Sequence, residues 1–195
     1  MTAVDEQYRS EYGWSIMLPE SWERLPTAGN GTALTIAPPV VFASSRDWTL
    51  ALTWMVESHP TQPKVVEAFL NATMLEGPAS VTEVQPVVQR IWPPIGEITE
   101  AEVAQLPDGN RALETLEEFD QGSGGESKKG YQLILLTNSG PGTPAYFQRL
   151  CFYAPSRSFS QHIEVVRRSA RSFHYDRDFQ LPGTEASQSS PIEEA

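Results

Sequence analysis

Two apolar runs separated by a turn constrain the fold most strongly, because together they predict a β-hairpin near the end of the chain. The runs cover residues 131–136 and 145–153, and the segment 138–144 between them is rich in glycine and proline. Strand-length apolar runs bounded by such residues are the usual signal of a hairpin. Residues 131–136 are apolar on both sides of the strand, which indicates that both faces of the sheet centre are covered.

A helix is predicted directly after this hairpin, over residues 158–173. Its apolar residues recur at steps of three and four, which places them on one face of a helix that packs on the sheet. They are Phe159, Ile163, Val166, Ala170 and Phe173. Ser158 and Gln161 have the spacing of a capping box for its first turn.

The first half of the chain predicts strands around a single helix. Alternating apolar residues predict strands at 14–18, 33–37 and 48–56, and we expect the last of these to be central in the sheet. Pro38 and Pro39 are expected to end the second strand. Four tryptophans in this half are expected to be core residues: Trp14, Trp22, Trp48 and Trp54.

The helix of this half is predicted to begin after Thr61 and to end at Gly77 and Pro78, since glycine and proline commonly follow a helix end. Its inner face is predicted from apolar spacing as Val66, Phe69, Leu70 and Thr73. The next segment, Val81 to Ile91, is predicted to be extended. Pro86 makes it an edge or interrupted strand, because proline cannot donate to a β-ladder.

A second hairpin is predicted from residues 98–106 and 111–119. Between them, Pro107 presets its backbone for a turn and Gly109 can adopt positive φ. Helix propensity alone would also permit a helix here, because both segments are rich in glutamate and alanine. The glycine-rich residues 121–130 are predicted to form a flexible loop.

These elements predict an α+β fold, with an antiparallel β-sheet covered by helices on both faces, which is an α/β/α sandwich. The chain of 195 residues suits one domain, which we place at residues 11–175. Residues 1–10 are expected to be flexible, and residues 176–195 to form a disordered acidic and polar tail.

Charge is distributed unevenly along the chain. The formal net charge is −11, which argues against general nucleic-acid binding. Residues 97–126 carry 9 acidic and 1 basic residue, whereas residues 127–175 carry 1 acidic and 7 basic residues. The middle of the chain is therefore acidic, and the C-terminal hairpin and helix are basic.

No export signal is recognisable at the N-terminus, which lacks a basic start and an apolar segment. No apolar run approaches the roughly 20 residues of a membrane span. We therefore expect a cytoplasmic location. Cys151, the only cysteine, is expected to be a buried, inert thiol in the last strand.

Motifs for catalysis or cofactor binding are not found in the sequence. His59, His162 and His174 lack the spacing and cysteine partners of a metal site. Residues 122–129 superficially resemble a phosphate-binding loop, but they lack its Gly-Lys-Ser/Thr ending. We expect a protein that is not an enzyme, with no catalytic residues, no cofactor and no metal site.

Two charged groups are the candidates for binding a protein partner. The acidic candidates are Glu114, Glu117 and Glu118, and the basic candidates are Arg167, Arg168 and Arg171. A solvated acidic hairpin face, whose charges oppose edge-to-edge pairing, is the simpler interpretation of the first group. A solvated outer helix face is the simpler interpretation of the second group.

Both ends of the predicted domain resemble the PsbP-like family of the Mog/PsbP-like superfamily. The opening "YGWSIMLPESWERL" resembles the first strand of that family and the Pro-x-x-Trp that follows it. The hairpin "YQLILLTNSGPGTPAYFQRLCFYAP" and the helix ending "VVRRSARSF" resemble its last two strands and terminal helix. The resemblance covers roughly residues 11 to 175.

This resemblance implies binding rather than catalysis, since the superfamily includes photosystem II subunits, a Ran-binding transport factor, lipoproteins and chaperones of type VI secretion effectors. It offers no catalytic residues to carry over. We therefore expect a protein-binding module that acts as an assembly factor, accessory subunit or chaperone. The alternative is a small-ligand-binding protein or cryptic hydrolase, with a pocket between sheet and helix lined by tryptophans.

Overall fold

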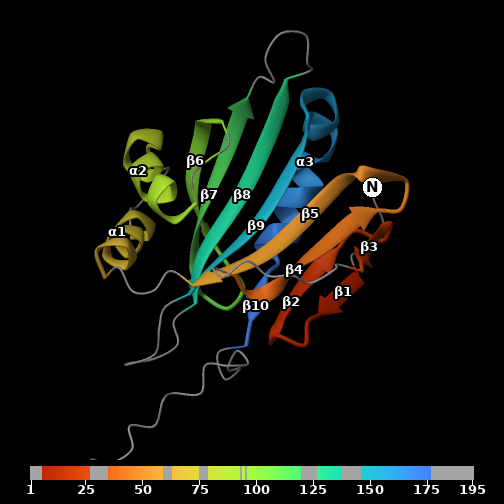
Figure 1. Cartoon of the computed structure of the whole chain (residues 1–195), viewed down its shortest axis with the longest axis horizontal. Helices are drawn as coiled ribbons and strands as arrows, with labels where there is room; N and C mark the ends of the chain where they lie inside the picture. Colours follow the sequence, from red (N-terminus) through yellow and green to blue (C-terminus); the bar gives the residue numbers. More distant parts are fainter. Residues whose placement is uncertain are drawn as a thin grey trace, which may run out of the picture.

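The computed structural model describes residues 6–26, 35–58, 63–74, 79–92, 94, 96–119, 127–137 and 146–176 (Figure 1). In chain order its elements are β1 (Glu6–Arg9), β2 (Trp14–Leu18), β3 (Trp22–Leu25), β4 (Thr35–Ser44), β5 (Asp47–Ser58), α1 (Pro63–Thr73), α2 (Val81–Ile91), β6 (Glu97–Gln105), β7 (Arg111–Phe119), β8 (Lys128–Thr137), β9 (Tyr146–Pro155), α3 (Ser156–Arg171) and β10 (His174–Tyr175).

The described strands form two antiparallel sheets. The larger has the order β3-β4-β5-β9-β8-β7-β6, and the smaller has the order β1-β2-β10. The predicted strand at 48–56 lies within β5, which pairs with both β4 and β9 and is therefore an interior strand. The α+β class is confirmed, but the prediction of one sheet is wrong, because β2 belongs to the smaller sheet.

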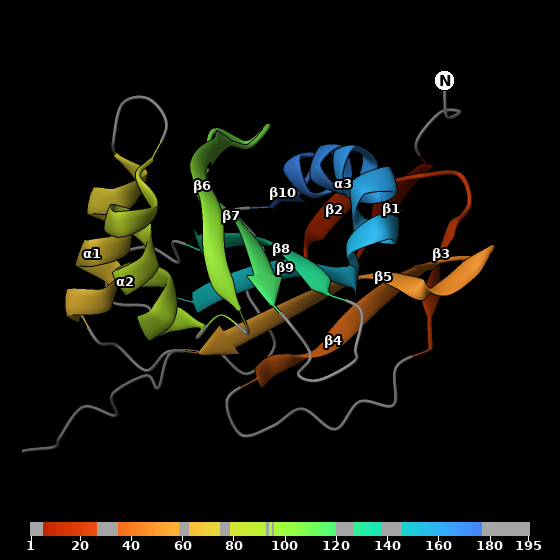
Figure 2. The same ribbon diagram turned by 90° about the horizontal axis from the view of Figure 1, so that it is seen from above.

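Buried apolar side chains divide into two clusters, and neighbouring residues of one strand belong to different clusters. In β8, Leu133 and Leu135 pack with α3 and β2, whereas Ile134 packs with α1 and α2. This division follows from the alternation of side chains across a strand. Figure 2 shows β6 and β7 between α2 and α3.

The small sheet is tied to the end of α3 by hydrogen bonds as well as by packing. Ser172 Oγ accepts from the backbone N–H of Met17 at 2.8 Å, and Ser169 Oγ donates to the Met17 carbonyl at 2.5 Å. Trp14 stacks on Phe173, with ring centroids 5.5 Å apart. The buried rings of Trp14, Trp22 and Trp54 confirm the predicted aromatic core for these three residues.

The prediction that Val81 to Ile91 is extended is wrong, because this segment forms helix α2. Ser80 and Glu83 form a capping box at its start, which satisfies backbone donors that the helix leaves unpaired. Val84, Val87, Val88 and Ile91 are buried, at the spacing of one helix face. Pro86 lies on the exposed side, where packing of the opposite face outweighs the lost hydrogen bond.

Three other boundaries differ from the sequence predictions. Residues 6–9 were expected to be flexible but form β1, which pairs with β2. Pro38 and Pro39 were expected to end a strand, yet β4 runs through them, with register shifts between Ala37 and Val40 that accommodate residues unable to donate to a ladder. The segment around Trp22, for which no strand was predicted, forms β3, an edge strand of the large sheet.

The two helices that the sequence predicted differ from the prediction in the start of α3 and in the buried face of α1. Helix α3 begins at Ser156, before the predicted capping box of Ser158, and no side chain caps its Pro155 N-cap. The first turn is held instead by the Ser156 backbone N–H, which donates to the Ser127 carbonyl at 2.9 Å. In α1, Phe69 and Thr73 are buried as predicted, but Leu70 is 43% exposed.

The predicted hairpin at 98–119 is confirmed as β6 and β7. Gly109 has a φ of 81° in the turn, and the Asn110 backbone N–H donates to Asp108 Oδ1 at 2.8 Å. The hairpin at the C-terminal end is likewise confirmed as β8 and β9. The predicted turn at 138–144, most of the loop at 121–130 and the tail after residue 176 lie outside the described residues.

Candidate partner-binding site

Helix α3 packs on the large sheet with its apolar side facing the strands. Phe159, Val166 and Ala170 are buried on that side, and the next turns carry Arg167 and Arg171 at its border. Residues four apart lie one above the other on a helix. These two guanidinium groups therefore reach the same part of the neighbouring strand β7.

Both arginines bind one buried carboxylate, that of Glu114 in β7. Arg167 Nε donates to Glu114 Oε1 at 2.5 Å, and Arg171 Nε donates to Glu114 Oε2 at 2.7 Å. The Glu114 side chain is only 1% exposed. Burial raises the pKa of Glu114 above its ordinary value, while the Arg167 charge and hydrogen bond oppose that effect. Such charge-assisted pairs anchor the helix to the sheet.

The outer ends of the same arginines meet exposed glutamates. Arg171 Nη2 donates to Glu102 of the edge strand β6, and Arg167 Nη1 lies 3.5 Å from Glu164 of α3. The side chains of Glu102 and Glu164 are 44% and 83% exposed. Ion pairs this exposed contribute about 0–1 kcal/mol to stability, so a partner can displace them at small cost.

Two shallow hollows flank this charged group. One, with a volume of about 390 Å³, is lined by Glu164, Arg167, Arg168, Arg171 and Ser172. The other, of about 160 Å³, lies between α3 and the β6–β7 pair, and Glu100, Glu102, Glu114 and Arg167 are among its lining residues. The surface that includes both hollows is called the α3–β6 surface below.

The structure brings some of the predicted partner-binding residues together and separates others. Glu114, Arg167 and Arg171 form the paired group, and exposed Arg168 lines the larger hollow. Glu114 was expected on a solvated face but is buried, because α3 covers that side of β7.

The remaining two acidic candidates lie elsewhere. Glu117, also expected on a solvated face, is buried on the other face of the sheet, where Gln132 Nε2 donates to its carboxylate. Glu118 is exposed and lies 3.7 Å from Lys129 Nζ. These two residues therefore do not contribute to the α3–β6 surface.

Tyr131 is a buried neighbour of Glu114 that sequence reasoning missed. Burial and the nearby Glu114 carboxylate raise the pKa of Tyr131 well above its ordinary value. The sequence offered one signal for this contact: Tyr131 and Glu114 both have a polar atom at the end of the side chain and lie in adjacent predicted strands. Periodicity alone does not give the strand register that joins them.

Other reactive groups in the described residues are dispersed. No three histidine, cysteine, aspartate or glutamate side chains there are arranged to hold a metal ion. His162 Nδ1 lies 2.9 Å from the Ser158 carbonyl, and His174 is exposed. Cys151 is buried as predicted, and burial raises the pKa of its thiol to about 11. His59 lies outside the described residues.

Solved structures show which fold this arrangement belongs to. The solution structure of cyanobacterial PsbP (CyanoP) from Synechocystis sp. PCC 6803 matches 89% of this chain and 94% of its own, with a TM-score of 0.56 and 15% identity. A crystal structure from Bacteroides thetaiotaomicron VPI-5482 matches 91% of this chain, with a TM-score of 0.50 and 11% identity. The match covers 50% of that second protein, so this chain spans about half of its length.

A third structure is LpqN, described as involved in cell envelope biogenesis of Mycobacterium tuberculosis, with a TM-score of 0.48, 11% identity and coverage of 87% of this chain and 88% of its own. No protein-family model matches the sequence, and no curated protein matches it. The chain therefore has a PsbP-like fold, as its sequence resemblance predicted. Among the described helices, none is both long enough and apolar enough to cross a bilayer.

Proposed function

We propose that this protein is a non-enzymatic protein-binding module, acting as an accessory subunit, assembly factor or chaperone. Its framework is an α/β/α sandwich of the PsbP-like kind, with α3 on one face of the large sheet and α1 and α2 on the other. The two apolar clusters that divide the residues of β8 support this arrangement. The PsbP-like fold agrees with the family resemblance of the sequence, which implies binding rather than catalysis and so supports an accessory role.

The observation that carries the proposal is the pair of arginines fixed by Glu114. Each guanidinium has five N–H groups, and Glu114 takes the Nε–H of both Arg167 and Arg171. Both arginines also line the larger hollow, and their outer N–H groups contact the exposed Glu102 and Glu164, which a partner can displace. A partner carboxylate would meet guanidinium groups that are already ordered, so less side-chain entropy is lost on binding. The partner's contact segment is therefore acidic.

The neighbouring edge strand sets the orientation of such a partner. Strand β6 ends the large sheet, and Glu97 and Glu100 along it are exposed. These charges oppose addition of another strand to this edge. They also repel an acidic segment, whereas the arginines of α3 attract it. The partner segment is thus expected to lie along α3 rather than along β6.

Site-specific crosslinking tests this proposal on the full chain. A photo-reactive residue at position 168 lies in the larger hollow, and the same residue at position 157 provides a matched control. Arg157 is an exposed arginine of the same helix. Eleven residues separate the two, which corresponds to about 16 Å and nearly the same helix side. We expect one partner to crosslink from position 168 in cells of the protein's own source, and not from position 157.

Charge reversal gives the second readout. Arg168→Glu should lower recovery of that partner by about tenfold or more, and Arg157→Glu should leave recovery unchanged. The loss should resemble the effect of high salt, because exposed charges are screened. Recovery of the same partner with all three proteins, at any salt concentration, would overturn the assignment of this surface. The cytoplasmic location remains a prediction from the sequence, and cell fractionation checks it.

A further inference from the structure

A group of polar side chains occupies the large sheet on the face opposite α3. Strand register places Thr115, Gln132 and Cys151 in one row across β7, β8 and β9. The next row contains Glu117, Gly130 and Tyr153. Cross-strand partners project to the same face of a sheet. We call this group, together with Arg149 of β9, the polar sheet face.

This face is unusual because polar atoms are buried there without partners. Thr115 and Glu117 are each 1% exposed, and Gln132 is fully buried. Within the described part of the chain, Thr115 Oγ1, Arg149 Nε and the Tyr153 hydroxyl are buried and have no hydrogen-bond partner. Leaving a buried polar atom unpaired costs about 1–3 kcal/mol. Three such hydrogen-bond donors on one face indicate that a bound ligand supplies their acceptors.

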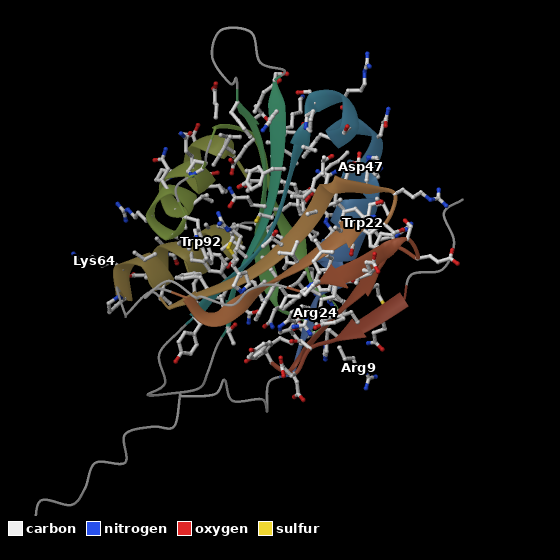
Figure 3. The ribbon with its side chains drawn as sticks, turned by 45° about the vertical axis from the view of Figure 1, so that its right-hand side comes forward. Arg9, Trp22, Arg24, Asp47, Lys64 and Trp92 are labelled. Carbon is white, nitrogen blue, oxygen red and sulfur yellow. The ribbon has the colours of Figure 1, made fainter. Side chains whose placement is uncertain are left out.

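Within the polar sheet face as defined here, the cation is Arg149, and three neighbouring side chains hold its guanidinium in place. Its guanidinium carbon lies 4.7 Å from the ring centre of Trp92, the residue after α2 that Figure 3 labels. Its Nη1 lies 3.4 Å from Gln132 Oε1, and its Nη2 lies 3.9 Å from Met55 Sδ. Among the described residues, Arg149 forms no ion pair, whereas Arg167 and Arg171 do.

Met55 is the register partner of Arg149 on β5, and smaller side chains precede it along that strand. Ala51 and Thr53 of β5 are partly exposed, and Thr53 is the register partner of Cys151. Gly130 lies beneath the Tyr153 ring, since an added Cβ would be 2.5 Å from that ring. The Tyr153 ring fills the space over Gly130, so a ligand body would lie over the partly exposed Ala51 and Thr53 of β5.

The charges of the face select the ligand class. One guanidinium and two hydroxyl groups match a carboxylate, which is planar and accepts several hydrogen bonds. Burial is the main cause that raises the pKa values of Tyr153 and Cys151, and the Glu117 carboxylate raises them further, so its charge reaches this region. That charge would repel a dianion such as a phosphate more strongly than a monoanion.

We propose that the polar sheet face binds a small organic monocarboxylate, with the carboxylate paired to Arg149 and hydrogen-bonded by Tyr153, and with an apolar or aromatic body lying over Ala51 and Thr53. Trp92 and Gln132 orient the guanidinium for this contact. The site lies on the opposite face of the sheet from the α3–β6 surface. A failure of this proposal therefore leaves the proposed protein-binding surface untouched, and the reverse also holds.

The test is a titration of the full chain with benzoate, indole-3-acetate and hexanoate at constant ionic strength, with benzamide as the uncharged counterpart of benzoate. Calorimetry gives the affinity, and the ¹⁵N–¹H signal of the Arg149 Nε–H reports the contact directly. We expect saturable binding of at least one carboxylate below about 1 mM, and benzamide binding at least about tenfold weaker. No saturation by any of the three below about 10 mM would overturn the proposal.

Three variants localise the binding. Arg149→Met should abolish it, and Arg149→Lys should weaken it about tenfold, because lysine keeps the charge but loses the planar pair of donors. Arg157→Met, which changes an exposed arginine of α3 outside both proposed sites, is the matched control and should bind as the wild type does. Retention of wild-type affinity in Arg149→Met would overturn the assignment. The Arg149 signal of the wild-type protein decides the matter even where a variant folds poorly.

Discussion

The two faces of the large sheet differ in how they hold arginine side chains. On the face under α3, the buried carboxylate of Glu114 receives N–H groups from Arg167 and Arg171. On the opposite face, the cation Arg149 rests on Trp92 and forms no ion pair among the described residues. Buried ion pairs are destabilised when one partner is removed, whereas an unpaired charge already bears its desolvation cost. The first arrangement is therefore structural, and the second leaves a guanidinium group without an ion pair, as the proposed carboxylate site requires.

The largest effect is expected where a carboxylate holds two cations. Glu114→Ala should lower the free energy of unfolding by about 3 kcal/mol, because it leaves two guanidinium groups without their shared partner and opens a cavity. Urea unfolding of the full chain measures this loss. The control is Glu118→Ala, which removes an exposed pair with Lys129 and should cost about 0.5 kcal/mol or less. Equal losses in the two variants would mean that Glu114 does not anchor α3.

Cysteine labelling measures how accessible the polar sheet face is. The pKa of the Cys151 thiol is raised to about 11 from an ordinary 9.0, mainly by burial. Each pKa unit lowers the thiolate fraction tenfold at a lower pH, so native Cys151 should react with iodoacetamide at pH 8 about a hundredfold more slowly than in the urea-unfolded chain. A native rate close to the unfolded rate would show that the face opens readily around this residue.

Packing of the Tyr153 ring on Gly130 gives an effect of intermediate size. A Cβ at position 130 would lie 2.5 Å from the ring, so Gly130→Ala should cost about 2 kcal/mol. The control is Gly109→Ala, in an open turn with a φ of 81°, where only backbone strain of about 1 kcal/mol is expected. If Gly130→Ala costs no more than Gly109→Ala, the ring moves aside easily and does not define the face.

Sequence patterns predicted those parts of the fold that local chemistry determines. The turn at Pro107 to Asn110 and the apolar side of α3 follow from residue type and spacing over a few residues. Helix α2 was missed because Pro86 was read as a strand signal. The stronger signals were the capping box of Ser80 and Glu83 and the helical spacing that begins at Val84. Packing against the sheet offsets the cost of the proline.

The candidate sites depend on register and on what covers each strand, which local patterns do not contain. Glu114 and Glu117 were predicted to be solvated, but both side chains are buried, each on its own side of β7. The pairing of Glu114 with Arg167 spans 53 positions. Arg149 did leave a signal, a single charge inside the apolar run 146–153. A charge at such a position indicates either an ion pair or a binding site.

Replacement of Arg149 is expected to have the smallest effect on stability, and it separates these two readings most sharply. Arg149→Met should change the free energy of unfolding by less than about 1 kcal/mol, since the lost contact with Trp92 is offset by removal of an unpaired charge. Arg167→Met is the matched variant on the other face and should cost more, because the buried Glu114 then loses one of its two cations. Urea unfolding of both variants gives the comparison. If Arg149→Met is as damaging as Arg167→Met, Arg149 serves the fold and the contrast between the two faces disappears. If it is nearly neutral, Arg149 is not required for folding, which is the result that the carboxylate proposal expects.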